Sequence, residues 1–109
     1  WHLITNPEIR AAINSTDEGI EGVKARSTWV IGGGRNTSGF TLLGAGGRKT
    51  NKTFIDLNKA AYWFFPTEFD ENIQAASQGY ISGYDNVFGI DDVYNYKAFG
   101  SSARCVKNY

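Results

Sequence analysis

Apolar residues recur at helical spacing only near the start of the chain. Ile9, Ala12 and Ile13 lie three and four positions apart, which places them on one face of a helix. Thr5 comes before this pattern and Glu8 follows it three residues later, the arrangement of a capping box at a helix start. The pattern predicts a helix over residues 7–14, and a weaker one predicts a second short helix over residues 20–26.

The rest of the chain consists of short apolar runs separated by glycine and polar residues. Such runs are typical of strands joined by turns, and we expect strands over residues 29–31, 40–43, 54–57, 61–65 and 102–107. Residues 73–82 and 86–96 read as a hairpin around residues 83–85. The run 61–65 is the most apolar and is expected to be a central, buried strand. Helices followed by antiparallel strands predict the α+β class.

Composition narrows the picture to one loop-rich domain. The chain has 109 residues, of which 41% are hydrophobic and 13 are glycine. This length is typical of one domain that buries its own core. The chain starts with Trp1 and contains no methionine, so we expect it to be a piece of a longer protein.

The charge pattern and the length of the apolar runs argue against nucleic-acid binding and against a membrane span. The 11 basic and 11 acidic residues balance, and the basic ones do not gather in any segment. A groove that follows a nucleic-acid backbone is therefore not expected. No apolar run reaches the roughly 18 residues that a membrane span needs.

Several catalytic and cofactor motifs fail on residue count or spacing. One histidine, His2, and one cysteine, Cys105, cannot build a Cys/His zinc site. A Ser-His-Asp triad would need His2 at the very edge of the domain. Residues 44–50 are rich in glycine, but Arg48 stands where a phosphate loop needs its second glycine. Cys105 lies within the last expected strand, where a free cysteine usually behaves as a small buried hydrophobe.

Acidic residues near the expected hairpin leave calcium open as a cofactor. Asp85, Asp91 and Asp92 can supply oxygen ligands from loops, as calcium sites require. The alternative is that they are turn residues, because Asp hydrogen-bonds locally to turn backbone.

Aromatic residues are the strongest candidates for ligand contact. Tyrosine buries a large area with few rotatable bonds and keeps a polar tip, which suits recognition of sugars or proteins. The residues expected to form such a site are Trp63, Glu68, Tyr80, Tyr84 and Tyr94. The alternative for each aromatic residue is packing beneath long loops.

The order of these pieces resembles the Fibrobacter-type major paralogous domain, or FISUMP, a family abundant in cell-surface proteins of Bacteroidetes and Fibrobacter. Members open with Trp-x-Leu-Pro, then Thr or Ser and an acidic helix start; residues 1–8 match, with Ile4 in place of the proline. A Ser-Gly-Phe-x-x-Leu segment matches at residues 38–43, followed by Gly46 and Arg48.

Later segments extend the resemblance over almost the whole chain. A Tyr-Trp-aromatic segment followed by Ser-Ser-Thr-Glu matches at residues 62–64 and 67–68, with Phe65 and Pro66 replacing the two serines. The closing Val-Arg-Cys-Val-Lys pattern appears at residues 103–107, with Ala103 first. The family is similar to C-type-lectin-like folds. This implies two short N-terminal helices on twisted antiparallel sheets, neighbouring first and last strands, and long loops.

The resemblance does not imply a calcium-dependent lectin site or an enzymatic activity, because the residues for these are absent. The Glu-Pro-Asn, Gln-Pro-Asp and Trp-Asn-Asp motifs of calcium lectins are absent. The fold is also similar to formylglycine-generating enzymes, but their reactive cysteine pair cannot exist with Cys105 alone.

The sequence therefore predicts a non-catalytic, extracellular or cell-surface module that binds a glycan or a surface protein. The alternative is a structural or assembly module of a larger extracellular complex or filament, with contacts to neighbouring chains.

Overall fold

A computed structural model describes residues 1–30, 33–68, 74–83, 88–89 and 94–108, with the side chains of residues 68, 88 and 94 left out. The elements follow in the order β1 (His2–Leu3), α1 (Asn6–Asn14), α2 (Ile20–Val23), β2 (Gly47–Arg48), β3 (Phe54–Ile55), β4 (Ala60–Glu68), β5 (Ala75–Ser82), β6 (Phe88–Gly89), β7 (Tyr94–Tyr96) and β8 (Cys105–Val106). Helices come first and antiparallel sheets follow, so the α+β class is confirmed.

The first helix begins as its sequence predicts. The Glu8 carboxylate reaches back and accepts hydrogen bonds from the backbone N–H of Thr5 at 3.0 Å and from its hydroxyl at 2.7 Å. Ile9 and Ile13 face the core and are buried. The helix predicted over residues 7–14 is therefore present as α1, with one more residue at its start.

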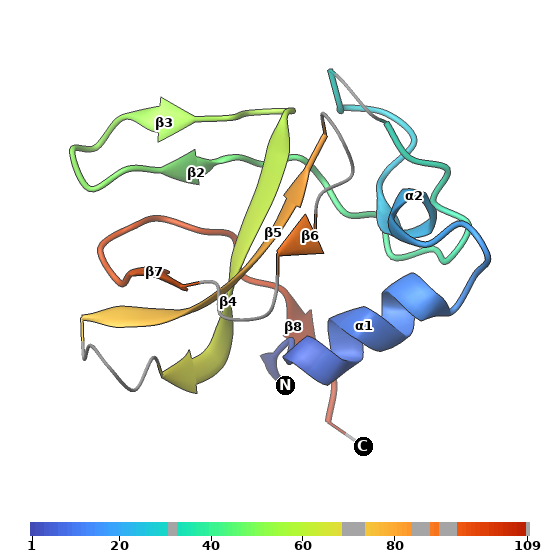
Figure 1. Cartoon of the computed structure of the whole chain (residues 1–109), viewed down its shortest axis with the longest axis horizontal. Helices are drawn as coiled ribbons and strands as arrows, with labels where there is room; N and C mark the ends of the chain where they lie inside the picture. The colour runs from blue at the N-terminus through green and yellow to red at the C-terminus, as the bar shows by residue number, and fades with distance from the viewer. Residues whose placement is uncertain (31–32, 69–73, 84–87, 90–93, 109) are drawn as a thin grey trace.

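The central sheet is built on β4 and β5, which run antiparallel with Tyr62 opposite Tyr80 (Figure 1). β6 and β7 pair with β5, both antiparallel, so the predicted pairing of the segments 73–82 and 86–96 is present in their described parts. The register of β4 shifts between Phe64 and Glu68, the stretch that contains Pro66. Proline has no N–H to donate to a ladder, which explains the irregularity there.

Two smaller sheets flank the central one. β1 pairs with β8, which brings the two ends of the chain to the same end of the molecule (Figure 1). β2 and β3 form a hairpin on the side of the central sheet away from α1 and α2 (Figure 1). Gly47 of this hairpin lies against the ring of Phe99, which ties the hairpin to the segment after β7.

The core lies between the central sheet and the helices. Alternate residues of β4 point into it, as expected for a strand with one covered face. The core cluster comprises Ile4, Ile9, Ile13, Val23, Ala25, Trp29, Leu42, Ala61, Trp63, Phe65 and Ile81.

The predicted second helix is present but shorter than expected, and two predicted strands are absent. The second helix ends at Val23, because Lys24 is extended and forms a parallel bridge with Leu42. The apolar run 40–43 contributes only this bridge and no strand, since Thr41 has a left-handed φ of 57°. Residues 29 and 30 also lie outside any strand, directly after Thr28 with its φ of 77°.

The last predicted strand is shorter than expected, and Cys105 faces outward. Only residues 105 and 106 pair, through β1. Val106 packs against the core, so its neighbour Cys105 points to the opposite side and is exposed. The expectation of a buried cysteine is therefore wrong.

Candidate functional site

A groove of about 220 Å³ in the described part of the molecule reaches the core. Its floor includes Ala61 and Trp63 of β4, together with Ile4 and Ile9 from the start of the chain. These four residues are buried, and Trp63 is only 3% exposed. The groove is thus an opening between the central sheet and α1, and we call it the β4 groove.

One wall of the β4 groove is the segment 40–45, and the main chain holds this segment in place. Leu42 donates its N–H to Val23 at 2.8 Å and accepts the N–H of Ala25 at 2.9 Å. The indole N–H of Trp29 donates to the same Leu42 carbonyl at 3.0 Å. The Asn36 side chain binds both the N–H and the hydroxyl of Thr41 at 2.8 Å, which stabilises the left-handed turn there.

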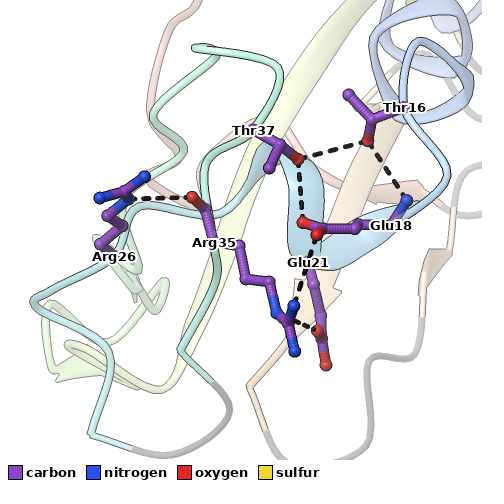
Figure 2. Close-up of polar contacts among 6 residues, drawn as sticks. All are labelled: Thr16, Glu18, Glu21, Arg26, Arg35 and Thr37. Carbon is purple, nitrogen blue, oxygen red and sulfur yellow. Dashed lines mark hydrogen bonds and ion pairs between the residues drawn. The ribbon is translucent and has the colours of Figure 1, made fainter.

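A polar cluster anchors the segment that leads into this wall (Figure 2). Arg35 forms ion pairs with Glu18 at 3.5 Å and Glu21 at 3.7 Å, and the Thr37 hydroxyl donates to Glu18 at 3.0 Å. The Arg35 side chain is 69% exposed, and exposed pairs contribute about 0–1 kcal/mol. We therefore infer that the cluster positions the segment 35–38 and adds little stability. The backbone N–H groups of Arg35 and Ser38 donate to the carbonyls of Glu21 and Gly22 and help to hold the same segment.

A buried lysine ties the base of the same loop to the central sheet. Lys24 has no exposed surface; its Nζ donates to the Ser82 carbonyl at 3.1 Å and lies 4.8 Å from the centre of the Trp29 ring. Gly34 lies directly against its stem, where a Cβ would overlap the Lys24 side chain. Burial of an ammonium group is costly unless it is hydrogen-bonded, so this position strongly constrains the loop.

The second wall is the segment 102–104, which enters beside β4. Ser102 donates its N–H to the Tyr62 carbonyl at 3.0 Å, and the Arg104 carbonyl accepts the N–H of Ile4 at 2.7 Å. The Arg104 side chain crosses to the first wall. Its guanidinium carbon lies 4.2 Å from the centre of the Phe40 ring, and its Nη2 donates to the Phe40 carbonyl at 2.7 Å.

The groove is apolar except at its rim. Among the described residues that line it, only Arg104 is charged. Two broader hollows, of about 480 and 490 Å³, lie elsewhere on the described surface. They lack buried apolar lining residues, so the β4 groove is the better candidate for binding an apolar group.

Comparisons with protein-family models, with curated proteins and with solved structures found no match for this chain. Among the described residues, no three His, Cys, Asp or Glu side chains gather as metal ligands would. Neither helix in the described ranges has the length and apolar character that a membrane crossing requires.

Of the residues expected to form a ligand site, only Trp63 and Tyr80 have described side chains, and these two lie on opposite faces of the sheet. Trp63 lines the groove floor, whereas Tyr80 lies on the opposite face of the sheet and its ring is 5.2 Å from that of Tyr62. Glu68 and Tyr94 lie in β4 and β7, but their side chains are outside the description. The other candidates lie outside the described residues: Tyr84, Asp85, Asp91 and Asp92.

The opposite face of the sheet carries a smaller aromatic cluster. The Tyr62 ring lies 5.4 Å from the Phe99 ring, and its hydroxyl donates to Asp56 at 2.6 Å. Burial raises the pKa of Tyr62 above its usual value, and the hydrogen bond to the Asp56 carboxylate raises it further. A tyrosine held protonated in this way acts as a structural donor.

Sequence reasoning missed Phe40 and Arg104 as groove residues. Both lie in segments that carry the family resemblance, 38–43 and 103–107, and this was the only available signal. They are separated by 64 positions in the chain, so their contact depends on the tertiary fold.

The only histidine belongs to a clip between the chain ends. His2 hydrogen-bonds to Asn108 at 2.5 Å through Nδ1 and contacts Glu8 at 2.9 Å through Nε2. The Thr5 hydroxyl donates to Glu8 and not to His2. A nucleophile must pass its proton to the histidine, so this order is wrong for a catalytic triad.

The clip predicts a raised histidine pKa. The hydrogen bond that the His2 ring donates to the Asn108 oxygen, followed by the one to Glu8, raises the pKa of His2 above 6.5, and hydrogen bonds from Thr5 and His2 lower the pKa of Glu8 below 4.5. Protonated His2 therefore stabilises the fold below pH 6.5, and this stabilisation is lost as the pH rises through the folded pKa. The Glu8 contribution is present above pH 4.5 and is lost as the pH falls through its own folded value.

An NMR titration of the single imidazole checks this expectation. Wild-type His2 should titrate above pH 6.5, and Glu8→Gln and Asn108→Ala should each move the midpoint back toward that value. A wild-type midpoint at or below 6.5 would contradict the clip.

Proposed function

We propose that this chain is a non-catalytic binding module, displayed outside a bacterial cell, that holds a glycan or a protein partner. The observation that carries the proposal is the β4 groove. Its floor is the rigid central sheet, and its walls are loops held by main-chain hydrogen bonds. A preformed apolar cleft with a few polar groups at its edge is the usual form of a binding site.

We also propose a C-type-lectin-like fold for the chain. The support is the pairing of β1 with β8, two short helices after β1, and a central antiparallel sheet with long connections. This is the arrangement that the FISUMP resemblance implies. In such a fold the scaffold holds loops whose residues contact the ligand.

Blocking the groove is expected to weaken binding strongly. Ala45 is exposed and lines the groove, so Ala45→Trp should fill its mouth without disturbing the core. Binding to a glycan array and to a peptide array should fall by about tenfold or more, the effect of losing one buried apolar group. Ala11→Trp, on an exposed position of α1 outside the groove, is the matched control and should bind like the wild type.

Each array is run with millimolar calcium and again with a chelator. Binding that occurs with calcium but is lost with chelator would support a calcium ion at Asp85, Asp91 and Asp92. Equal binding by the two variants, or no binding by the wild type on either array, would contradict the proposed function.

Assembly into a larger complex is the second candidate, and an exposed aromatic residue favours it. Phe54 is 77% exposed at the β2–β3 hairpin, and Arg48 lies over its ring at 5.7 Å. An exposed aromatic side chain on a projecting hairpin is available for contact with a neighbouring chain. Self-association of the wild type that is lost in Phe54→Ser would favour this candidate over the first.

A further inference from the structure

Within the described part of the chain, the guanidinium of Arg104 makes one hydrogen bond and leaves most of its donors unused. It has five N–H groups, and the structure shows one of them donated, to the Phe40 carbonyl. The Phe40 ring lies 4.2 Å from its central carbon, so this contact and the hydrogen bond together restrain the group. No carboxylate in the described part of the chain forms an ion pair with Arg104. A planar, preoriented guanidinium of this kind matches the two oxygens of a carboxylate.

The apolar part of the groove has the size of one large side chain. Its volume is about 220 Å³, and a cavity of about 150 Å³ is enough to hold benzene. Leu42, Ala61 and Trp63 present apolar atoms to this space. A phenylalanine or leucine side chain therefore fits below the guanidinium.

Exposed apolar residues also lie on the first wall and on two segments that hydrogen bonds join to it. Leu43 lines the groove and is 51% exposed, while Val30 and Leu57 are 66% and 67% exposed. Hydrogen bonds from Asn58 to Gly44 at 2.5 Å and from Val30 to Asn58 at 2.8 Å join the three segments that carry these residues. We call Val30, Leu43 and Leu57 the apolar ridge. A ligand longer than one residue would contact it.

We infer that the β4 groove binds the C-terminal residue of a polypeptide, with a large apolar side chain in the groove and its carboxylate on Arg104. The residues before it would lie on the apolar ridge. Capture of a chain terminus by fixed donors is an established mode of peptide recognition. This inference rests on the proposed function and specifies its ligand.

The first experiment compares three probes by titration of isotope-labelled protein. They are acetyl-Gly-Leu-Gly-Phe with a free carboxylate, the same peptide as a C-terminal amide, and N-acetyl-phenylalanine. The free acid should bind at least about tenfold more tightly than the amide, because hydrogen bonds to a charged group are lost in the amide. It should also bind about tenfold more tightly than N-acetyl-phenylalanine, which cannot reach the ridge.

The second experiment places the carboxylate on Arg104. Arg104→Gln should lower the affinity for the free-acid peptide by about tenfold or more and leave the affinity for the amide peptide unchanged. Arg48→Gln is the matched control, because Arg48 also lies over a phenylalanine ring but outside the groove. Binding of both peptides to this variant should equal that of the wild type.

Several outcomes overturn the inference while leaving the proposed function intact. Equal affinity for acid and amide removes the role of the carboxylate. Equal affinity for the peptide and for N-acetyl-phenylalanine would show that the residues before the last one add nothing, so that the ligand is a small carboxylate. No peptide binding, when an array ligand is lost in Ala45→Trp, shows that the groove takes a different ligand.

Discussion

Replacing Trp63 with alanine should lower the free energy of unfolding by about 3–5 kcal/mol. Its side chain is 3% exposed, and its ring meets that of Phe65 edge-on with the centres 6.2 Å apart. The change removes one of the two tryptophan side chains of the core cluster and leaves a cavity that the β-sheet cannot close. Urea denaturation followed by circular dichroism measures the loss.

Trp63→Phe is the conservative comparison and should cost less, about 1–2 kcal/mol. The indole Nε1 is buried and has no hydrogen-bond partner among the described residues. Phenylalanine lacks this N–H, so the substitution also removes the cost of burying an unsatisfied donor. A loss as large as that of alanine would show that this donor has a partner.

Gly79 provides an internal test of the same contact. A Cβ at this position would overlap the indole ring of Trp63, so Gly79→Ala should cost about 1–3 kcal/mol in the wild type. The cost should shrink in the Trp63→Ala background, where the methyl group enters the cavity. Additive losses in the double variant would contradict this packing arrangement.

Gly46→Ala should destabilise the chain by about 2–4 kcal/mol, for two separate reasons. Gly46 has a φ of 67°, a conformation that L-residues adopt only at a cost. In addition, a Cβ there would overlap the Ile55 carbonyl oxygen and come within 2.8 Å of the Leu57 nitrogen. Both neighbours are backbone atoms, so no rotamer change can relieve the clash.

Gly39→Ala separates the two reasons. Gly39 has a similar φ of 75°, but a Cβ there would meet no atom within 4 Å. Gly39→Ala should lower the free energy of unfolding only by the cost of the left-handed conformation, about 1–2 kcal/mol. Both variants are compared by urea denaturation, and equal losses would mean that the overlap at Gly46 carries no energy.

Local sequence patterns were enough to predict α1 and β4. The start of α1 depends on Thr5 and Glu8, three residues apart, and its buried face on Ile9 and Ile13. The apolar run 61–65 likewise marked β4, but the expectation of a central, buried strand was wrong: β5 is the central strand, and only alternate residues of the run are buried. These elements follow from interactions between near neighbours, so the α+β order could be read from the chain alone.

The tertiary structure decided the loops. Residues 40–43 form an apolar run typical of a strand, yet Asn36 holds Thr41 in a left-handed turn and Leu42 bonds to Val23 and Ala25. Cys105 became exposed because pairing with β1 set which neighbour faces the core. Such choices depend on partners distant in sequence, which a local pattern does not contain.

The candidate site shows the same division. The sequence by itself determined the helix start, the strand β4 and the residue types available for recognition, since each depends on local spacing and composition. Only the tertiary structure brought Arg104 onto Phe40 across 64 positions and opened the β4 groove between them and β4. Contacts of that kind follow from how β1, β4 and the loops pack together, because the groove lies between elements and not within any one of them.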